Sequence, residues 1–236
     1  MTYNIHHGQG MDGKIDIKRI SDICKDANAD LIALQEVDRG VERTGKIDIM
    51  NLLKEYTDLS IAFGKNIDFQ GGDYGNGILS KYKIDSVKNI HYKMIRPGEQ
   101  RGMLQSVVNI NGENVVFIDT HTGDKSNDEE KQMNVDEIIS AIKDYPDMPV
   151  ILCGDFNSTP DTKMHKALKE YFVDIWEMLN GSNGYSFPSV NPDRRIDYIY
   201  ISKNILNRIK PLSIKLIRSE ASDHLPVVAE FELLGN

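Results

Sequence analysis

Residues 150–157 read Val-Ile-Leu-Cys-Gly-Asp-Phe-Asn, a short apolar run that ends in a polar turn. Four consecutive apolar residues at this position predict a strand that is buried on both faces. The residues that follow, 154–160, predict a turn, because Asp and Asn side chains accept hydrogen bonds from nearby backbone amides. Asp155 therefore stands at the end of a buried strand, which is where open α/β sheets gather their functional groups.

Polar or acidic side chains follow a β-rich run at several other places in the chain. These segments are Thr2–Gly8, Leu34–Asp38, Ile118–His121, Arg195–Ile199 and Ser222–Pro226. Each segment alone is equally typical of a turn or a surface loop, but their joint occurrence in this order favours a shared site. If the strand ends meet, carboxylates from Glu36, Asp155, Asp197 and Asp223 lie in one cleft.

Carboxylates that share a cleft repel one another, and a bound cation removes the conflict. A hard divalent ion such as Mg²⁺ uses one or two carboxylates together with substrate phosphate. The chain has no Cys/His spacing typical of zinc, and His6-His7 is not a pair of ligands one helical turn apart. We therefore predict Mg²⁺ as the cofactor, with Mn²⁺ as a substitute.

Helices and strands alternate along the sequence. Helical periodicity appears at residues 17–27, 49–56, 135–142 and 161–171. Apolar or alternating runs predict about ten strands, with Asn111-Gly112 as a hairpin turn. The glycines at 71–72, 75 and 77 are interpreted as turns around a short strand at Ile78-Leu79. Short turns between strands exclude purely parallel sheets, so the pattern predicts an α/β sandwich with mixed sheets inside and helices outside.

Composition narrows the class of protein. The net charge is −8, with 36 acidic and 28 basic side chains, which argues against a nonspecific nucleic-acid coat. No apolar run approaches the ~18 residues of a membrane span, and the two cysteines predict buried thiols rather than a disulfide framework. We expect one soluble domain over residues 1–236 and a monomer. We expect no signal peptide before Thr2, and either the chain starts here or a leading segment has been removed, so the compartment, cytoplasmic or secreted, stays open.

The segments LQEVD (34–38), GDFNSTP (154–160), RRIDYI (194–199) and SDHLPV (222–227) together resemble the endonuclease/exonuclease/phosphatase superfamily, with its deoxyribonuclease-I-like fold. The resemblance extends from Thr2 to about Phe231 and implies a four-layer α/β/β/α sandwich with two mixed β-sheets flanked by helices. Within the superfamily, NIHHG (4–8) and EQRG (99–102) are similar to a bacterial metal-dependent hydrolase subgroup.

The resemblance also implies roles for individual residues. Glu36 matches the principal metal carboxylate, Asn4 matches an asparagine that supports the metal or the nucleophile, and Asp223 matches an acidic residue near the metal. The catalytic residues that it implies are His121, Asp155, Asn157, Asp197 and His224. Asp197 would orient His224, and whether His224 acts as a base or as a cationic phosphate clamp stays open at this point.

These observations predict a Mg²⁺-dependent phosphoesterase that attacks a phosphomonoester or phosphodiester with water. The acidic net charge favours a phosphorylated small substrate, derived from a lipid or a sugar, over nucleic acid. His7, Asn76 and Arg101 are the candidates for substrate binding, since Arg suits bidentate phosphate contact. The alternatives are a metal-dependent endonuclease or exonuclease and a non-catalytic binding module on the same fold.

Overall fold

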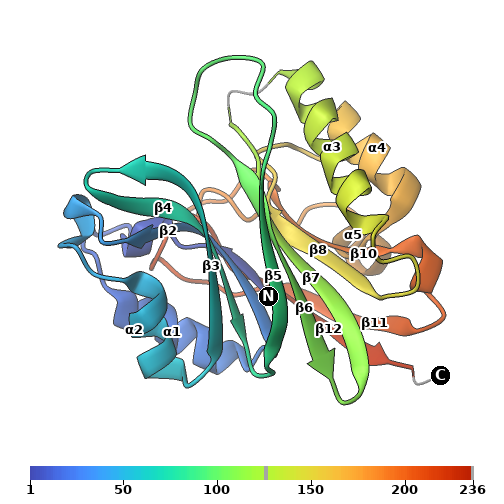
Figure 1. Cartoon of the computed structure of the whole chain (residues 1–236), viewed down its shortest axis with the longest axis horizontal. Coiled ribbons are helices and arrows are strands. Elements are labelled where there is room, and N and C mark those ends of the chain that lie inside the picture. The colour runs from blue at the N-terminus through green and yellow to red at the C-terminus, as the bar shows by residue number, and fades with distance from the viewer. Residues whose placement is uncertain (125–126, 235–236) are drawn as a thin grey trace.

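The computed structural model describes residues 1–124 and 127–234. Within these residues, two six-stranded sheets pack face to face, and helices cover their outer faces (Figure 1). The strands are β1 (Thr2–Asn4), β2 (Leu31–Arg39), β3 (Ser60–Phe69), β4 (Gly72–Ser80), β5 (Ile84–His91), β6 (Gly102–Ile110), β7 (Glu113–His121), β8 (Val150–Asp155), β9 (Phe172–Asp174), β10 (Asp197–Ser202), β11 (Ile209–Leu216) and β12 (Val227–Leu233). The helices are α1 (Ile17–Ala27), α2 (Ile49–Thr57), α3 (Asp128–Ile142), α4 (Lys163–Tyr171) and α5 (Ile175–Asn180), and the short 3-10 turns are η1 (His6–Gly8), η2 (Glu42–Thr44) and η3 (Lys203–Ile205).

Both sheets are mixed. The strand order is β11-β12-β1-β2-β4-β3 in the first sheet and β5-β6-β7-β8-β10-β9 in the second. In the described residues, β1 and β2 run parallel in the first sheet, β7 and β8 run parallel in the second, and the other pairs are antiparallel. The predicted four-layer α/β/β/α sandwich is thereby confirmed.

The alternation of side chains along β2 shows how the layers are held together. Ile32 and Leu34 pack with Ile20 of α1 on the outer face of the first sheet. Ala33, which points the other way, lies in the cluster between the sheets that also contains Ile199 of β10. Both faces of the strand are therefore buried, as its continuous apolar sequence predicts. A third cluster lies between the second sheet and helices α3 and α4.

Helix α1 illustrates how local sequence sets the element boundaries. Asp16 caps its N-terminus by accepting a hydrogen bond from the backbone N–H of Arg19 at 3.2 Å. Asn28 ends the helix in the left-handed conformation. The predicted inner face is confirmed, because Ile17, Ile20 and Cys24 are buried.

None of the helices in the described ranges has both the length and the apolar character that crossing a bilayer requires.

The interpretation of the glycines in β4 was wrong. Gly71 does lie in the β3–β4 turn with a φ of 78°, but the strand continues without a turn from Gly72 to Ser80. A Cβ on Gly75 would lie 1.9 Å from the carbonyl oxygen of Gly64 in β3. Glycine is therefore needed there for close contact between strands. β3 itself is an edge strand that mixes polar and apolar residues, and the sequence pattern did not predict it.

Candidate functional site

Polar residues from both sheets meet at one edge of the sandwich. Asn4 ends β1, and its strand runs parallel to β2, which contains Glu36. In the second sheet, His121 ends β7 and pairs in register with Asp155 at the end of β8. Asp197 begins β10 and lies opposite Asp155 in an antiparallel pair. Asn4, His121 and Asp155 thus lie at the carboxyl ends of their strands, as predicted. The prediction was wrong for Glu36, which lies within β2, and for Asp197, which begins β10, because the strand pairing and not the strand end brings these two residues to the same edge.

Asp155 lies at the centre of this group. Its Oδ2 accepts a hydrogen bond from Asn4 Nδ2 at 3.1 Å and lies 3.5 Å from His121 Nε2 and 3.7 Å from His224 Nε2. Its Oδ1 accepts the backbone N–H of Asn157 at 2.9 Å. Burial raises the pKa of Asp155 to about 7, although the charge of His224 acts in the opposite direction. This carboxyl group is therefore a stronger base than an exposed aspartate.

His224 is the cationic imidazole of the site. Its Nδ1 lies 2.9 Å from Asp197 Oδ2, which also accepts a hydrogen bond from Ser186 Oγ at 2.6 Å. Burial alone would lower the pKa of His224, but the carboxylates of Asp197 and Asp155 raise it to about 10. The ring is consequently protonated at neutral pH and directs Nε2–H toward Asp155.

His121 is the neutral imidazole on the other side of Asp155. Burial lowers the pKa of His121 well below its usual value, and the charges of Arg101 and His224 lower it further. Arg101 Nη1 lies 2.7 Å from His121 Nδ1, and Asn157 Nδ2 lies 3.3 Å from Nε2. One carboxylate is thus flanked by a cationic ring and a neutral ring, an arrangement that can move a proton and hold an anion.

Glu36 occupies an irregular position in β2. The β2–β4 register shifts between Leu34 and Val37, and Glu36 has a left-handed backbone with a φ of 61°. Its Oε1 accepts a hydrogen bond from Asn4 Nδ2 at 3.1 Å, so a single amide group holds both Glu36 and Asp155. Such support from a neighbouring polar group is typical of carboxylates that bind metals.

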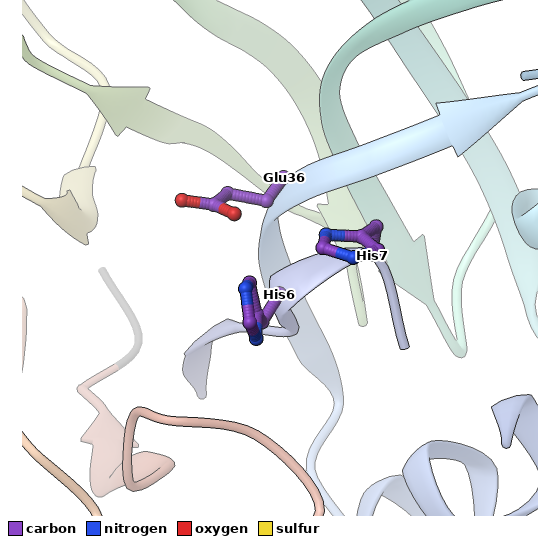
Figure 2. Close-up of side chains that lie close together, drawn as sticks. All are labelled: His6, His7 and Glu36. Atoms are coloured by element: carbon purple, nitrogen blue, oxygen red, sulfur yellow. The ribbon is translucent and has the colours of Figure 1, made fainter. Parts of the chain in front are cut away.

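Two groups of side chains among the described residues could hold a metal ion. Asp155, Asp197 and His224 form one, and His6, His7 and Glu36 form the other, with the ligand atoms of each group within 4.8 Å of one another. Figure 2 shows the second group, in which both imidazole rings lie beside the Glu36 side chain. The first group, with two carboxylates and one imidazole, is the richer in oxygen donors, and the Oδ1 atom of Asp197 has no hydrogen-bond partner within the described chain.

Asp223, a predicted metal ligand, lies at the rim of this site. Its side chain is about one-third exposed, and its Oδ1 lies 3.8 Å from His6 Nδ1. Ser222 Oγ donates a hydrogen bond to the same oxygen at 3.3 Å. Asp223 therefore faces His6 and is in neither group of closely spaced ligand atoms.

The structure separates the three residues predicted to bind substrate. His7 and Arg101 line a pocket of about 170 Å³ together with Glu36. Asn76 is buried in β4, where its Oδ1 accepts a hydrogen bond from Asn66 Nδ2 at 3.0 Å, and it is not among the lining residues of that pocket. A second pocket of about 490 Å³ shares Arg101 and extends outward past residues 93–98.

Sequence reasoning missed several members of the site. His6 lies in the segment NIHHG (4–8), and its position next to His7 was the feature of the sequence that could have indicated a role in the site. Ser186, which holds Asp197, lies in a loop with no distinguishing pattern. Lys131 of α3 donates hydrogen bonds to the carbonyl oxygen of Asn157 at 2.8 Å and to Ser158 Oγ at 2.6 Å. A lysine on an amphipathic helix gives no sign of such a role in the sequence.

Comparison with known proteins agrees with the fold. The family model described as the Endonuclease/Exonuclease/phosphatase family matches residues 1–224. The uncharacterised protein YbhP of Escherichia coli K12 is 26% identical, over 99% of this chain and 95% of its own length.

Two solved structures share the fold. An endonuclease/exonuclease/phosphatase from Beutenbergia cavernae superposes with a TM-score of 0.84 at 21% identity, covering 99% of this chain and 71% of its own. A mannosyl-6-phosphatase from Bacteroides thetaiotaomicron has a TM-score of 0.78 at 16% identity, covering 98% of both chains.

Proposed function

The chain belongs to the Endonuclease/Exonuclease/phosphatase family, and on that premise we propose that it is a metal-dependent phosphoesterase. In this proposal water attacks a phosphomonoester or phosphodiester in line with the leaving oxygen. The observation that supports the proposal most is the position of Asp155 between the protonated His224 and the neutral His121. Members of the family are generally hydrolases of phosphoester bonds.

The protonation states assign the roles. Asp155, whose pKa is about 7, is suited to orient the attacking water and accept its proton. His224 is cationic, so it serves as a clamp for a phosphate oxygen rather than as a base. Asp197 keeps that ring charged and oriented. Asn157 Nδ2, near His121, would donate a hydrogen bond to the phosphate.

The proposed cofactor is Mg²⁺, with Mn²⁺ as a substitute. Glu36 and Asp223 would supply carboxylate oxygens to the ion. Asn4 would act by holding Glu36, because its amide nitrogen bonds to that carboxylate and its Oδ1 already accepts the backbone N–H of His6 at 3.0 Å. A bound Mg²⁺ would neutralise the charge of the phosphate oxygens and stabilise the leaving oxygen.

A phosphorylated small molecule, derived from a sugar or a lipid, is the proposed substrate class. The net charge of −8 disfavours a long polyanion. The pocket beside Glu36 is small, at about 170 Å³, and Arg101 on its wall can contact a phosphate group. Nucleic acid is the alternative substrate and is an outcome of the experiment that follows.

The experiment is a hydrolysis screen with Mg²⁺ or Mn²⁺. Sugar phosphates including mannose 6-phosphate, phospholipids, generic phosphodiesters and plasmid DNA are offered to the wild type and to the variants His224→Ala and Glu36→Ala. We expect turnover of a small phosphoester that chelator and both substitutions abolish, while circular dichroism shows both variants folded. His91→Gln, which changes an exposed imidazole on β5, is the matched control and should retain full activity.

Plasmid nicking that is strong and is lost in His224→Ala would assign the chain as a nuclease instead. Retained activity in Glu36→Ala would remove that residue from the metal site. A protein that hydrolyses none of these substrates and has no metal affinity would be a binding module.

A further inference from the structure

His6 and His7 lie in an unusual backbone conformation next to Glu36. Successive side chains on a strand point to opposite sides. Here both histidines are left-handed, with φ values of 44° and 45°, and their ring centroids are only 4.5 Å apart. The 3-10 turn η1 therefore presents two consecutive imidazoles to the same space, beside the Glu36 carboxylate (Figure 2).

The hydrogen bonds of His7 determine which ring nitrogen is free to bind a ligand. His7 Nε2 lies 3.2 Å from Gln9 Oε1, and Gln9 Nε2 donates to the carbonyl oxygen of Gly13 at 3.2 Å. The second bond fixes the amide so that its oxygen faces His7. Because an amide oxygen only accepts, Nε2 must have the proton and Nδ1 must have the lone pair. Ligand histidines in metal sites are held by their other N–H in this way.

The Nδ1 atom of His7 is the ring nitrogen left for a ligand to bind. The residue is 7% exposed, and Nδ1 is buried with no hydrogen-bond partner in the described part of the chain. A buried polar atom without a partner destabilises the fold, because it has lost its hydrogen bonds to water. His7 belongs to a group in which one ligand atom from each of its three residues lies within 4.8 Å of the others, and Nδ1 is the ring nitrogen of His7 that has no partner in the described residues. A bound cation would satisfy this atom.

The charges around the group are compatible with a cation. Arg43 makes two hydrogen bonds of 2.8 Å to Asp38, and Arg101 lies 3.0 Å from Glu99. These arginines are thus paired with carboxylates other than Glu36. His6 Nδ1 lies 3.8 Å from the carboxylate of Asp223, which adds a second negative charge beside the group.

We propose that His6, His7 and Glu36 bind a divalent transition-metal ion of the Co²⁺ and Zn²⁺ class through two imidazole nitrogens and one carboxylate. Imidazole ligands favour these ions, whereas Mg²⁺ prefers oxygen ligands. The sequence argued against zinc because the two histidines are not one helical turn apart, but the left-handed turn makes that spacing unnecessary. The inference rests on the proposed function only in that both use Glu36 as a metal ligand.

The test measures Co²⁺ binding to the metal-free protein by its visible d–d absorption and by calorimetry. We expect a Co²⁺ site that excess Mg²⁺ does not empty and that is lost in His6→Gln and His7→Gln. Gln9→Leu should weaken Co²⁺ binding about 10–100-fold, while Gln9→Glu, which still accepts from Nε2, should bind nearly as tightly as the wild type. His91→Gln and His224→Gln should keep the absorption band.

Several results would overturn the site. If both His6→Gln and Gln9→Leu bind Co²⁺ as tightly as the wild type, the proposed site is wrong. This result is decisive even if His7→Gln does not fold and cannot be measured. Loss of the band in His224→Gln but not in His6→Gln would place the ion at the other group. Mg²⁺-dependent hydrolysis is measured on the same preparations. Turnover without Co²⁺ binding refutes this inference alone, and Co²⁺ binding without turnover refutes the proposed function alone.

Discussion

The Nδ1 atom of His224 lies 2.9 Å from the Oδ2 atom of Asp197, and both side chains are buried. The carboxylate receives a second hydrogen bond from Ser186 Oγ at 2.6 Å. Because β10 pairs antiparallel with β8, the same strand register that positions Asp197 also places it opposite Asp155. The imidazole is thus shared between two carboxylates, and its charge depends on both.

The first prediction concerns the pKa of His224 in the metal-free protein. Burial would lower this pKa, but Asp197 and Asp155 raise it to about 10. Asp197→Asn removes the nearer charge and should lower the pKa by about 1–3 units. An NMR titration of the imidazole signals measures it, with His224→Gln identifying the resonance. A wild-type value near 6.5 would contradict the assignment of His224 as a cation.

The second prediction is the effect of pH on stability. The folded-state pKa of His224 is about 10, above its unfolded value, so its stabilising contribution is complete below pH ~6.5 and is lost as pH rises through about 10. The difference in unfolding free energy between wild type and His224→Gln should therefore shrink as pH increases from 7 to above 10. Urea denaturation of metal-free samples measures it. A difference that is constant or grows would show that the charge of His224 is not stabilised in the fold.

The third prediction separates the chemical and structural roles of Asn157. Its φ is 45°, and its Nδ2 donates to the carbonyl oxygen of Thr122 at 3.0 Å. Asn157→Ala should lower the rate constant roughly 10²–10³-fold through loss of a donor to the phosphate. Asn157→Gly should lose as much activity but less stability, because glycine adopts a positive φ readily. Steady-state kinetics and thermal melts are the measurements, and a rate near wild type would limit Asn157 to a turn role.

The fourth prediction concerns Gly154, which precedes Asp155. Its φ is 148°, and an added Cβ would lie 1.9 Å from the carbonyl oxygen of Thr120 in β7. Gly154→Ala should reduce the free energy of unfolding by about 2 kcal/mol or more, because the parallel strands must separate. Gly45→Ala, also at a positive φ but with open space around it, should cost about 1 kcal/mol. If urea denaturation gives equal losses of unfolding free energy for the two variants, the close approach of Gly154 to Thr120 does not explain the effect of Gly154→Ala.

Local patterns in the sequence were sufficient for much of the fold. The apolar run at β8 and the spacing of Ile138 and Ile139 in α3 were predicted correctly, because burial of a strand or of one helix face depends on residues near in sequence. The edge strand β3 was not predicted from the sequence. Its mixture of polar and apolar residues has no clear period and is explained only by its pairing with β4. The glycine at 75 was misinterpreted for the same reason: its close neighbour, Gly64, lies on another strand.

By itself, the sequence determined the kinds of element and the chemical groups at the strand ends, because periodicity, turn residues and carboxylates are properties of short segments. Only the tertiary structure decided which groups meet. It placed Asn76 in the interior beside Asn66, and it brought His6 next to Glu36 through two left-handed residues and a register shift in β2. The physical reason is that contacts across the sandwich depend on strand register and on backbone angles that packing imposes, and neither is encoded in any one segment.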